Sequence, residues 1–466
     1  TVWDTGAVPG AGDVVDTGGF NIVYDANSDA HITEVYVAGG SAWSWDPTKL
    51  TKLVVDTFHT ATTATIENGV SNSIPDSGVA GWPRAHVVFK AFEDPGPTPR
   101  MGMMTRGPVR LMGADKDTVV KASVDPMAGD TVLQFANTPA GWKVGDRVIV
   151  QSTANYKSST NDPDGYKPRN TYWNIANNNA NNEKPYGTWR DPEFPLSEDE
   201  VRTITAIDAS GNVTIDAALT YDHDGLAPRT LTNGKVVELR PVVAMLTHSI
   251  LFESADPSGL RGHVMFMHGD TQAWYVESRN TGRTKSDVTL TVDSATDNEI
   301  YSKDPNSGGV PLKDPNNVIG RYPFHIHPDP GNGPFFSAEM AVFWGLSAWA
   351  EPNQPAIPGN VYVQHQARGA FENCVGYNFR GGGMNSEWGN EIGQWIGNAM
   401  FWGRGDGLIY DWGMRAERNM NHDTHMGVAY GNQARQILML DNVYSSCRVG
   451  FMYMQTTKKQ GERIPQ

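Results

Sequence analysis

The strongest constraint on the fold is a recurring pattern of short strand-like segments that are followed by Asn or Gly. Three such segments, 372–377, 397–401 and 441–444, are spaced by roughly 20–25 residues or a multiple of that distance. No long stretch keeps the apolar period of an amphipathic helix, and Gly and Pro make up 49 + 29 = 78 of the 466 residues. A repeat of this size is typical of a parallel β-solenoid, in which each coil buries one side against the next. We therefore expect an all-β protein with a parallel β-helix over residues 246–466.

The chain before this region has a different pattern. Residues 1–115 alternate apolar and polar positions between frequent Gly, Asp and Asn turns, which predicts a separate glycine-rich β-sandwich or β-roll domain. Trp43 and Trp45 share one face of a strand there and are expected to pack in the core, with a sugar-stacking platform as the alternative. Residues 116–245 are predicted to form a β-rich connecting domain. It contains a long polar insertion, 154–200. Loops of this length in compact proteins are usually functional or mobile.

Composition limits the class of partner. The formal net charge is −15, from 37 Lys and Arg against 52 Asp and Glu, and no basic patch stands out, so nucleic acid is not expected as a partner. No apolar run is long enough for a membrane span. The chain starts at Thr1 without Met, and we interpret it as a mature or excised product that is secreted or held at the cell surface.

The two cysteines provide a test of the solenoid. Cys374 and Cys447 lie 447 − 374 = 73 positions apart, which is about three coils of roughly 4.8 Å each. A disulfide requires Cα atoms within about 7 Å of each other. We therefore predict two free, buried thiols.

One region concentrates the reactive side chains. The segments 261–270, 282–284 and 320–327 hold four of the twelve histidines together with three arginines and one aspartate. His325 and His327 are two positions apart, so on a strand both imidazoles project from the same face. Such a face, beside a carboxylate and arginines, can bind a metal, move a proton or hold an anionic sugar.

Several chemical roles are open for these residues. His268, His325 and His327 are candidate metal ligands, and a divalent metal such as zinc, copper or calcium is a candidate cofactor. Two His with a carboxylate suit zinc, iron or copper better than calcium. The alternatives are an acid/base pair, or one imidazole that points into the core. The candidate catalytic residues are His268, Asp270, Arg321, Tyr322, His325, His327 and Glu387. The candidate substrate-binding residues are Arg283, Trp388, Glu391 and Trp395.

Two reactions on an acidic glycan fit this set. Hydrolysis needs two carboxyl groups, one protonated and one ionised. Elimination at a uronic acid needs a positive charge on the uronate, a base for the C5 proton and an acid for the leaving oxygen, which Arg321, Tyr322 and the two histidines could supply. Salt bridges along the coil edge and core packing of the tryptophans are the structural alternatives.

The order of several blocks resembles a known family. The blocks that carry the resemblance are 12–15, 141–146, 202–204, 219–223, 262–268 and 320–327. They resemble successive blocks of the cell-migration-inducing hyaluronan-binding protein and transmembrane hyaluronidase family, including its bacterial relatives. Glu387 and Glu391 stand where the family pattern has acidic residues, whereas Gly382 replaces a His and Trp388 an Asp.

The resemblance implies a right-handed parallel β-helix behind an N-terminal β-domain, an extracellular location, and a link to hyaluronan or another acidic polysaccharide that is often calcium-dependent. We therefore expect a secreted polysaccharide-active protein, a glycoside hydrolase or a polysaccharide lyase, with a cleft on the β-helix face. The alternatives are a non-catalytic glycan-binding or adhesion module and a metal-binding extracellular protein. Further C-terminal chain or another subunit is expected to cover the end of the solenoid.

Overall fold

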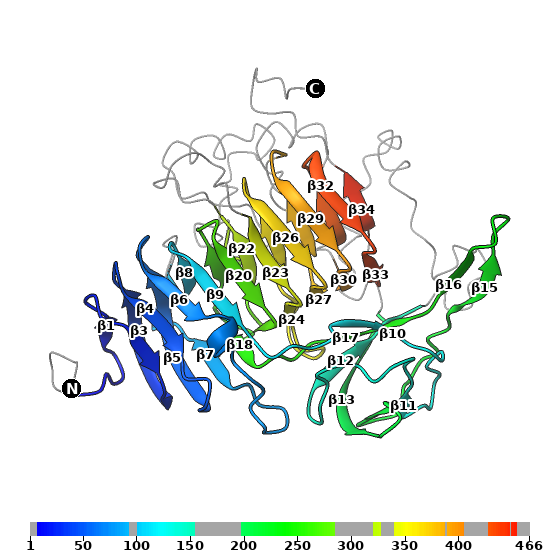
Figure 1. Cartoon of the computed structure of the whole chain (residues 1–466), viewed down its shortest axis with the longest axis horizontal. Coiled ribbons are helices and arrows are strands. Elements are labelled where there is room, and N and C mark those ends of the chain that lie inside the picture. The colour runs from blue at the N-terminus through cyan, green and yellow to red at the C-terminus, as the bar shows by residue number, and fades with distance from the viewer. Residues whose placement is uncertain are drawn as a thin grey trace, which may run out of the picture.

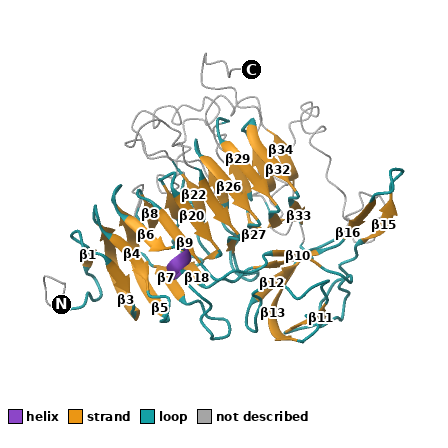
Figure 2. Cartoon of the chain, in the orientation of Figure 1, coloured by secondary structure: helices purple, strands orange, loops and turns teal. Residues whose placement is uncertain are grey.

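The chain is almost entirely β-structure, as expected. The computed structural model describes residues 7–92, 100–153, 197–284, 320–327, 340–386, 389–404, 427–447 and 449–453. The one helical element among them is a short 3-10 turn, η1 (Val70–Asn72), and every other regular element is a strand (Figures 1 and 2). Accordingly, no helix in the described part of the chain could span a membrane.

Most strands stack in parallel into a β-helix with three sheets (Figure 1). Sheet 1 contains the first halves of β3 (Asn27–Val37) and β5 (Thr51–Thr60), then β7 (Ala85–Phe89), β18 (Ile250–Ser254), β21 (Val276–Arg279), β24 (Ser347–Trp349), β27 (Val375–Phe379), β30 (Ala399–Gly403) and β33 (Val443–Ser445). Sheet 2 contains β1 (Val14–Asp16), the second halves of β3 and β5, then β8 (Gly102–Thr105), β19 (Val264–Phe266), β22 (Phe324–Ile326), β25 (Tyr362–Gln364), β28 (Met384–Ser386), β31 (Val428–Asn432) and β34 (Val449–Tyr453). Sheet 3 contains β2 (Ile22–Tyr24), β4 (Ala42–Trp45), β6 (Thr65–Asn68), β9 (Val109–Met112), β20 (Thr271–Trp274), β23 (Ala341–Trp344), β26 (Arg368–Glu372), β29 (Ile392–Ile396) and β32 (Gln436–Leu440).

The parallel register explains the repeat in the sequence. Val375 pairs with Ala399, 399 − 375 = 24 positions further on, so equivalent residues of successive coils lie side by side. Alternate side chains point into the coil, where like residues stack, as Phe343 and Phe371 do with ring centroids 5.0 Å apart. At the turns, the side chain of Asn398 donates a hydrogen bond to that of Asn442 (2.8 Å), which satisfies polar groups that the coil corner buries.

The prediction of a separate N-terminal β-sandwich or β-roll over residues 1–115 is wrong. β7, β8 and β9 pair in parallel with β18, β19 and β20, so the N-terminal strands are the first coils of the same β-helix. Alternation with frequent turns describes a coil corner as well as a sandwich hairpin, and the pattern alone does not distinguish them. Trp43 and Trp45 are buried in the shared core, as predicted.

A small antiparallel barrel interrupts the β-helix between β9 and β18. Its strands are β10 (Val119–Lys121), β17 (Val242–Met245), β12 (Arg147–Val150), β13 (Glu200–Ile207), β14 (Val213–Ile215) and β11 (Val132–Leu133), in spatial order. A bridge between Ala122 and Phe135 brings the two edges of the sheet together. The hairpin of β15 (Leu226–Thr230) and β16 (Val236–Leu239) extends from it (Figure 1). Most of the predicted polar insertion at 154–200 lies outside the described residues.

The barrel packs against the outer face of sheet 1. Its side chains Ile149, Val242 and Ala244 share an apolar cluster with Tyr377 and Phe401 of the β-helix. Because the barrel lies across several coils, it covers a face that would otherwise expose aromatic side chains to water.

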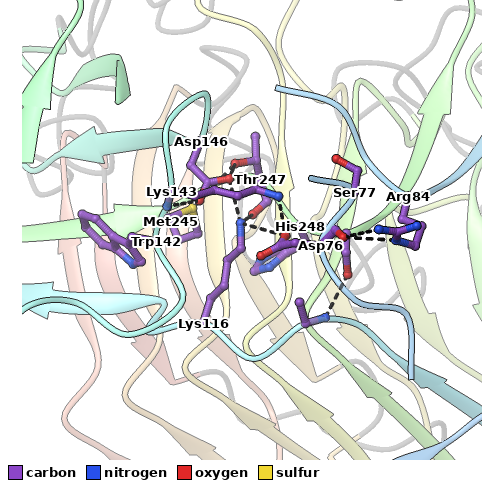
Figure 3. A network of polar contacts seen from close by, with 12 residues as sticks. Asp76, Ser77, Arg84, Lys116, Trp142, Lys143, Asp146, Met245, Thr247 and His248 are labelled. Carbon is purple, nitrogen blue, oxygen red and sulfur yellow. Dashed lines mark hydrogen bonds and ion pairs between the residues drawn. The ribbon is translucent and has the colours of Figure 1, made fainter. Parts of the chain in front are cut away.

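A polar network lies where the barrel leaves the β-helix (Figure 3). Lys116 forms a buried ion pair with Asp146 at 2.7 Å, and Thr247 donates a hydrogen bond to the same carboxylate. Lys143 pairs with Asp76 at 2.6 Å, which ties the barrel to the turn before β7. The contacts fix the orientation of the barrel at its point of insertion.

Both cysteines are free, as predicted. Cys374 is buried, whereas Cys447 is only half-buried, so the prediction of two buried thiols holds for the first and not for the second.

Candidate functional site

Three imidazoles gather on the outer face of sheet 2. His325 lies in β22, and His327 and His365 follow β22 and β25, which are paired in register from Phe324 and Tyr362 onward. The ring centroids of His325 and His327 are 5.2 Å apart, those of His327 and His365 are 4.5 Å apart, and those of His325 and His365 are 5.9 Å apart. The two histidines of the sequence motif therefore project to the same side, as strand alternation predicts.

His365 is a site residue that the sequence did not single out. It ends the strand-like segment 361–365, and its position opposite His327 depends on the pairing of Ile326 with Gln364. The two histidines are 365 − 327 = 38 positions apart, which differs from the 24 positions between Val375 and Ala399, so only the coil register could have aligned them.

The three histidines differ in access to solvent. His325 is 1% exposed, with its Nδ1 3.0 Å from the carbonyl oxygen of Gly320, to which it donates. His327 and His365 are half-buried. A ligand at this face would therefore meet His327 and His365, with His325 behind them.

Two arginines lie near His263, on the coils that follow it. The backbone of Arg283 donates to the carbonyl of Arg321 at 2.8 Å, so the two residues are adjacent on neighbouring coils. Arg321 is buried and Arg283 is half-buried. Tyr322 is buried, with its ring 5.2 Å from that of His325 in an edge-on contact.

The pKa of His263 is lowered in part by the positive charge of this region. Its side chain is buried, and its Nδ1 donates to the carbonyl of Met101 at 3.1 Å. Burial, followed by the charges of Arg321 and Arg283, lowers the pKa of His263 well below its usual value, so this imidazole stays neutral. A Cβ on Gly102 would lie 2.6 Å from the His263 ring, so only glycine leaves room for it.

His268 and Asp270 do not join this group, which corrects the prediction. They lie in the turn from β19 to β20, and this turn carries the chain round the corner from sheet 2 to sheet 3. The backbone amide of Asp270 donates to Nδ1 of His268 at 3.0 Å, and the Asp270 carboxylate pairs with Arg110 at 2.6 Å on the outer side of sheet 3. The predicted ligand set of His268, His325 and His327 is therefore not assembled.

No other metal-binding group replaces that set within the described ranges. No three or more His, Cys, Asp or Glu side chains are arranged there to hold a metal ion. The distances between the ring centroids of His325, His327 and His365 are those of packing contacts between neighbouring side chains.

The predicted substrate-binding residues are dispersed. Trp395 is 0% exposed inside the coil, where its Nε1 donates to the Gln364 side chain, so a sugar cannot stack on it. Glu391 is also buried and accepts hydrogen bonds from the backbone amides of Gly389 (2.8 Å) and Gln366 (3.2 Å), which is a turn-stabilising position. Glu387 and Trp388 lie outside the described residues.

A second charged cluster lies on the outer face of sheet 1, at the edge of the barrel. Arg279 donates to Glu253 at 2.9 Å, and His86 lies 3.0 Å from the other oxygen of that carboxylate. Glu277 lies next to them under the barrel, where it accepts a hydrogen bond from Nε1 of Trp349 at 3.0 Å. These contacts match the structural alternative of salt bridges along the coil edge.

Comparison with known proteins does not identify a family. No family model matches the chain, and no curated protein is similar to it. Among solved structures, the chain is similar to the Gp54 tailspike of Acinetobacter baumannii bacteriophage AP22 in complex with A. baumannii capsular saccharide, with 8% identity over 89% of this chain and 53% of that one. It is also similar to the tailspike gp49 of Pseudomonas phage LKA1 (10% identity, 86% and 55% of the two chains) and to the tailspike gp61 of Pseudomonas phage phi297 (10%, 90% and 67%). The TM-scores are 0.18, 0.19 and 0.19, too low to transfer a function, and the chain spans little more than half of the first two proteins.

Proposed function

We propose that the protein acts on an acidic polysaccharide, with the outer face of sheet 2 as its site. The observation that carries the proposal is the pair of half-buried imidazoles, His327 and His365, 4.5 Å apart on neighbouring coils. Arg321 precedes β22 on the same coil, and its charge together with that of Arg283 lowers the pKa of His263. Imidazoles that reach solvent next to fixed positive charge are the groups needed to bind a carboxylate-bearing sugar and move a proton at it.

The reaction that fits this arrangement is β-elimination at a uronic acid. In this reaction Arg283 binds the uronate carboxylate and so acidifies the proton at C5. One imidazole of the His327–His365 pair takes that proton, the electron pair forms the C4–C5 double bond, and the bond from C4 to the leaving oxygen breaks. The other imidazole, protonated, donates a proton to that oxygen. The buried Tyr322 and Arg321 support the site from behind, since neither side chain reaches solvent.

Hyaluronan or a similar polymer as substrate, a secreted or cell-surface location and a divalent metal are further parts of the proposal. They are supported by the resemblance of the sequence blocks to the hyaluronan-binding and hyaluronidase family. None of the proton transfers above passes through a metal ion. Dialysis against a chelator, followed by addition of calcium or zinc, would show whether activity depends on one.

The test is incubation of the purified protein with hyaluronan, chondroitin, alginate and pectate. Both new reducing ends and the ultraviolet absorbance of an unsaturated product are measured. Both signals together mean elimination, and reducing ends alone mean hydrolysis. Retention on an immobilised polymer without either product would establish the alternative, a non-catalytic glycan-binding module.

The matched substitution is His327→Ala, with His59→Ala as its control. His59 is also half-buried and lies on the outer face of sheet 2, in the row of His325, but it pairs with Glu34 at 2.9 Å in an N-terminal coil. We expect His327→Ala to lower the rate by at least about a hundredfold, because it removes an acid/base group, and to change the melting temperature little. Activity that is equally sensitive to both substitutions, or unfolding of His327→Ala, would refute the assignment of this face.

A further inference from the structure

The outer face of sheet 3 changes character along the β-helix. In β9 and β20 it carries Arg110, Gln272 and the Arg110–Asp270 ion pair. In the next four coils, β23, β26, β29 and β32, it becomes mostly apolar. We call this surface the sheet-3 patch, and its apolar members are Met340, Val342, Trp344, Ile392, Ile396, Leu438 and Leu440.

The patch is open to solvent. Met340 is 44% exposed, Leu438 50% and Leu440 48%, and Val342, Ile392 and Ile396 are half-buried. The register places Ile396 beside Leu440, and Figure 1 shows the strands that carry the patch side by side. β26 separates the apolar side chains of β23 from those of β29, because it places Arg368 between Met340 and Ile392 and Glu372 between Trp344 and Ile396. Exposed apolar side chains gathered on one face mark an interaction surface, because they are unfavourable to leave in water.

Two charges within the patch make it self-complementary. On β26, Arg368 begins the strand and is exposed, whereas Glu372 ends it and accepts a hydrogen bond from Gln394. Arg368 forms no ion pair with any residue that the structure describes. A second copy related by a two-fold axis parallel to the β-helix axis presents its strands in the opposite direction, so Arg368 of each copy faces Glu372 of the other.

The charge of the patch itself permits the same occupant. Two copies with a formal charge of −15 each repel one another, so they can associate only through a surface without net negative charge. The patch carries one Arg and one Glu, which cancel. A glycan fits less well, because most of the positions are aliphatic and offer few hydrogen-bond partners to sugar hydroxyl groups.

We propose that the protein forms a two-fold symmetric dimer through the sheet-3 patch. Apolar side chains of the two copies pack face to face, as in the core between two sheets, and two Arg368–Glu372 pairs set the register. The patch is on a different sheet from the histidine cluster, so dimerisation leaves that face free.

The experiment measures the mass of the full chain by light scattering and sedimentation over a range of concentrations. We expect a concentration-dependent dimer. Leu438→Asp should weaken it by at least tenfold, because it places a charge in the contact without disturbing the fold. Leu226→Asp is the matched control, since Leu226 is also exposed but lies on the β15–β16 hairpin, and it should leave the dimer unchanged.

Charge reversal tests the register. Arg368→Glu should weaken the dimer at least tenfold because it opposes like charges at two symmetric positions, and adding Glu372→Arg should restore it. A monomer at every concentration would overturn the proposal. So would a double variant that is no tighter than Arg368→Glu alone, or a monomer that binds polysaccharide and loses this binding with Leu438→Asp.

Discussion

Glu253 and Glu277 lie on adjacent coils of sheet 1, and their environments move their pKa values in opposite directions. Burial raises the pKa of Glu277 to about 7, against the weaker opposing effects of Arg279 and the backbone amide of His248. Burial acts on Glu253 in the same sense, but the hydrogen bond from His86 and the charge of Arg279 outweigh it and lower its pKa to about 2. One carboxyl therefore changes protonation near neutral pH, while its neighbour stays ionised.

The first prediction concerns the pH dependence of stability. Because folding raises the pKa of Glu277, its stabilising contribution is complete below its unfolded pKa of 4.5 and is lost as the pH rises through about 7. The loss is on the order of 3 kcal/mol. We expect Glu277→Gln to be less sensitive to pH than the wild type between about pH 5 and pH 8, measured by urea unfolding.

Glu253→Gln serves as the opposite case. The lowered pKa of Glu253 means that its contribution is present above 4.5 and lost as the pH falls towards about 2. Glu253→Gln should therefore have a lower unfolding free energy than the wild type at neutral pH, and this difference should disappear in acid. Equal pH profiles for the two variants would contradict the assignment.

A glycine contact gives the second prediction. Gly393 has φ +151°, and a Cβ there would lie 1.7 Å from the carbonyl oxygen of Gly369 on the neighbouring coil. Gly393→Ala should cost at least about 3 kcal/mol of unfolding free energy, because backbone must move. Gly69→Ala is the control, since its Cβ would meet only Arg110 at 3.5 Å, and it should cost far less in the same urea titration.

At the scale of elements, the barrel is held to the β-helix by both apolar packing and buried charge. Burial raises the pKa of Asp146 even though Lys116 lies 2.7 Å away, so desolvation offsets much of the attraction within this pair. Such a pair fixes geometry more than it adds stability, whereas loss of one partner leaves a buried charge uncompensated.

Lys116→Met tests this arrangement and is the third prediction. It should cost about 3–5 kcal/mol in urea unfolding, since the Asp146 carboxylate loses its counter-ion. Adding Asp146→Leu should recover part of the loss. A double variant that is less stable than Lys116→Met alone would show that the ion pair is not the cause.

The sequence predicted elements better than their assembly. The Asn- and Gly-marked repeat identified the parallel β-helix because coil corners need those residues, and the alternation of His325 and His327 placed both on one face. The same local patterns could not show that β1–β9 are coils of the same β-helix. His365 was missed and His268 wrongly included because a corner turn decides which sheet a residue joins, and that depends on pairing between distant segments.

At the scale of the whole molecule, the three sheets have three different outer faces. The barrel covers that of sheet 1, the histidines and arginines occupy that of sheet 2, and the apolar patch lies on that of sheet 3. Removal of the barrel from the outer face of sheet 1 should therefore lower solubility, even though the coils themselves are intact.

The fourth prediction is that replacing residues 117–245 with a short linker yields aggregated protein, because Tyr377 and Phe401 lose the barrel that packs on them. The measurement is the soluble fraction and its elution on size exclusion. Removing only the 226–239 hairpin, whose strands pair with each other in a sheet of their own, is the control and should leave the protein soluble. Soluble, monodisperse protein without the barrel would show that the covered face does not need it.

The position of the barrel in the chain has a consequence for synthesis. A ribosome completes it before β24, β27, β30 and β33 emerge, although these later strands carry the surface that it covers. The folded barrel can thus serve as a template on which each later coil packs as it leaves the exit tunnel. The aromatic side chains on the outer face of sheet 1 then contact the barrel as soon as they are synthesised.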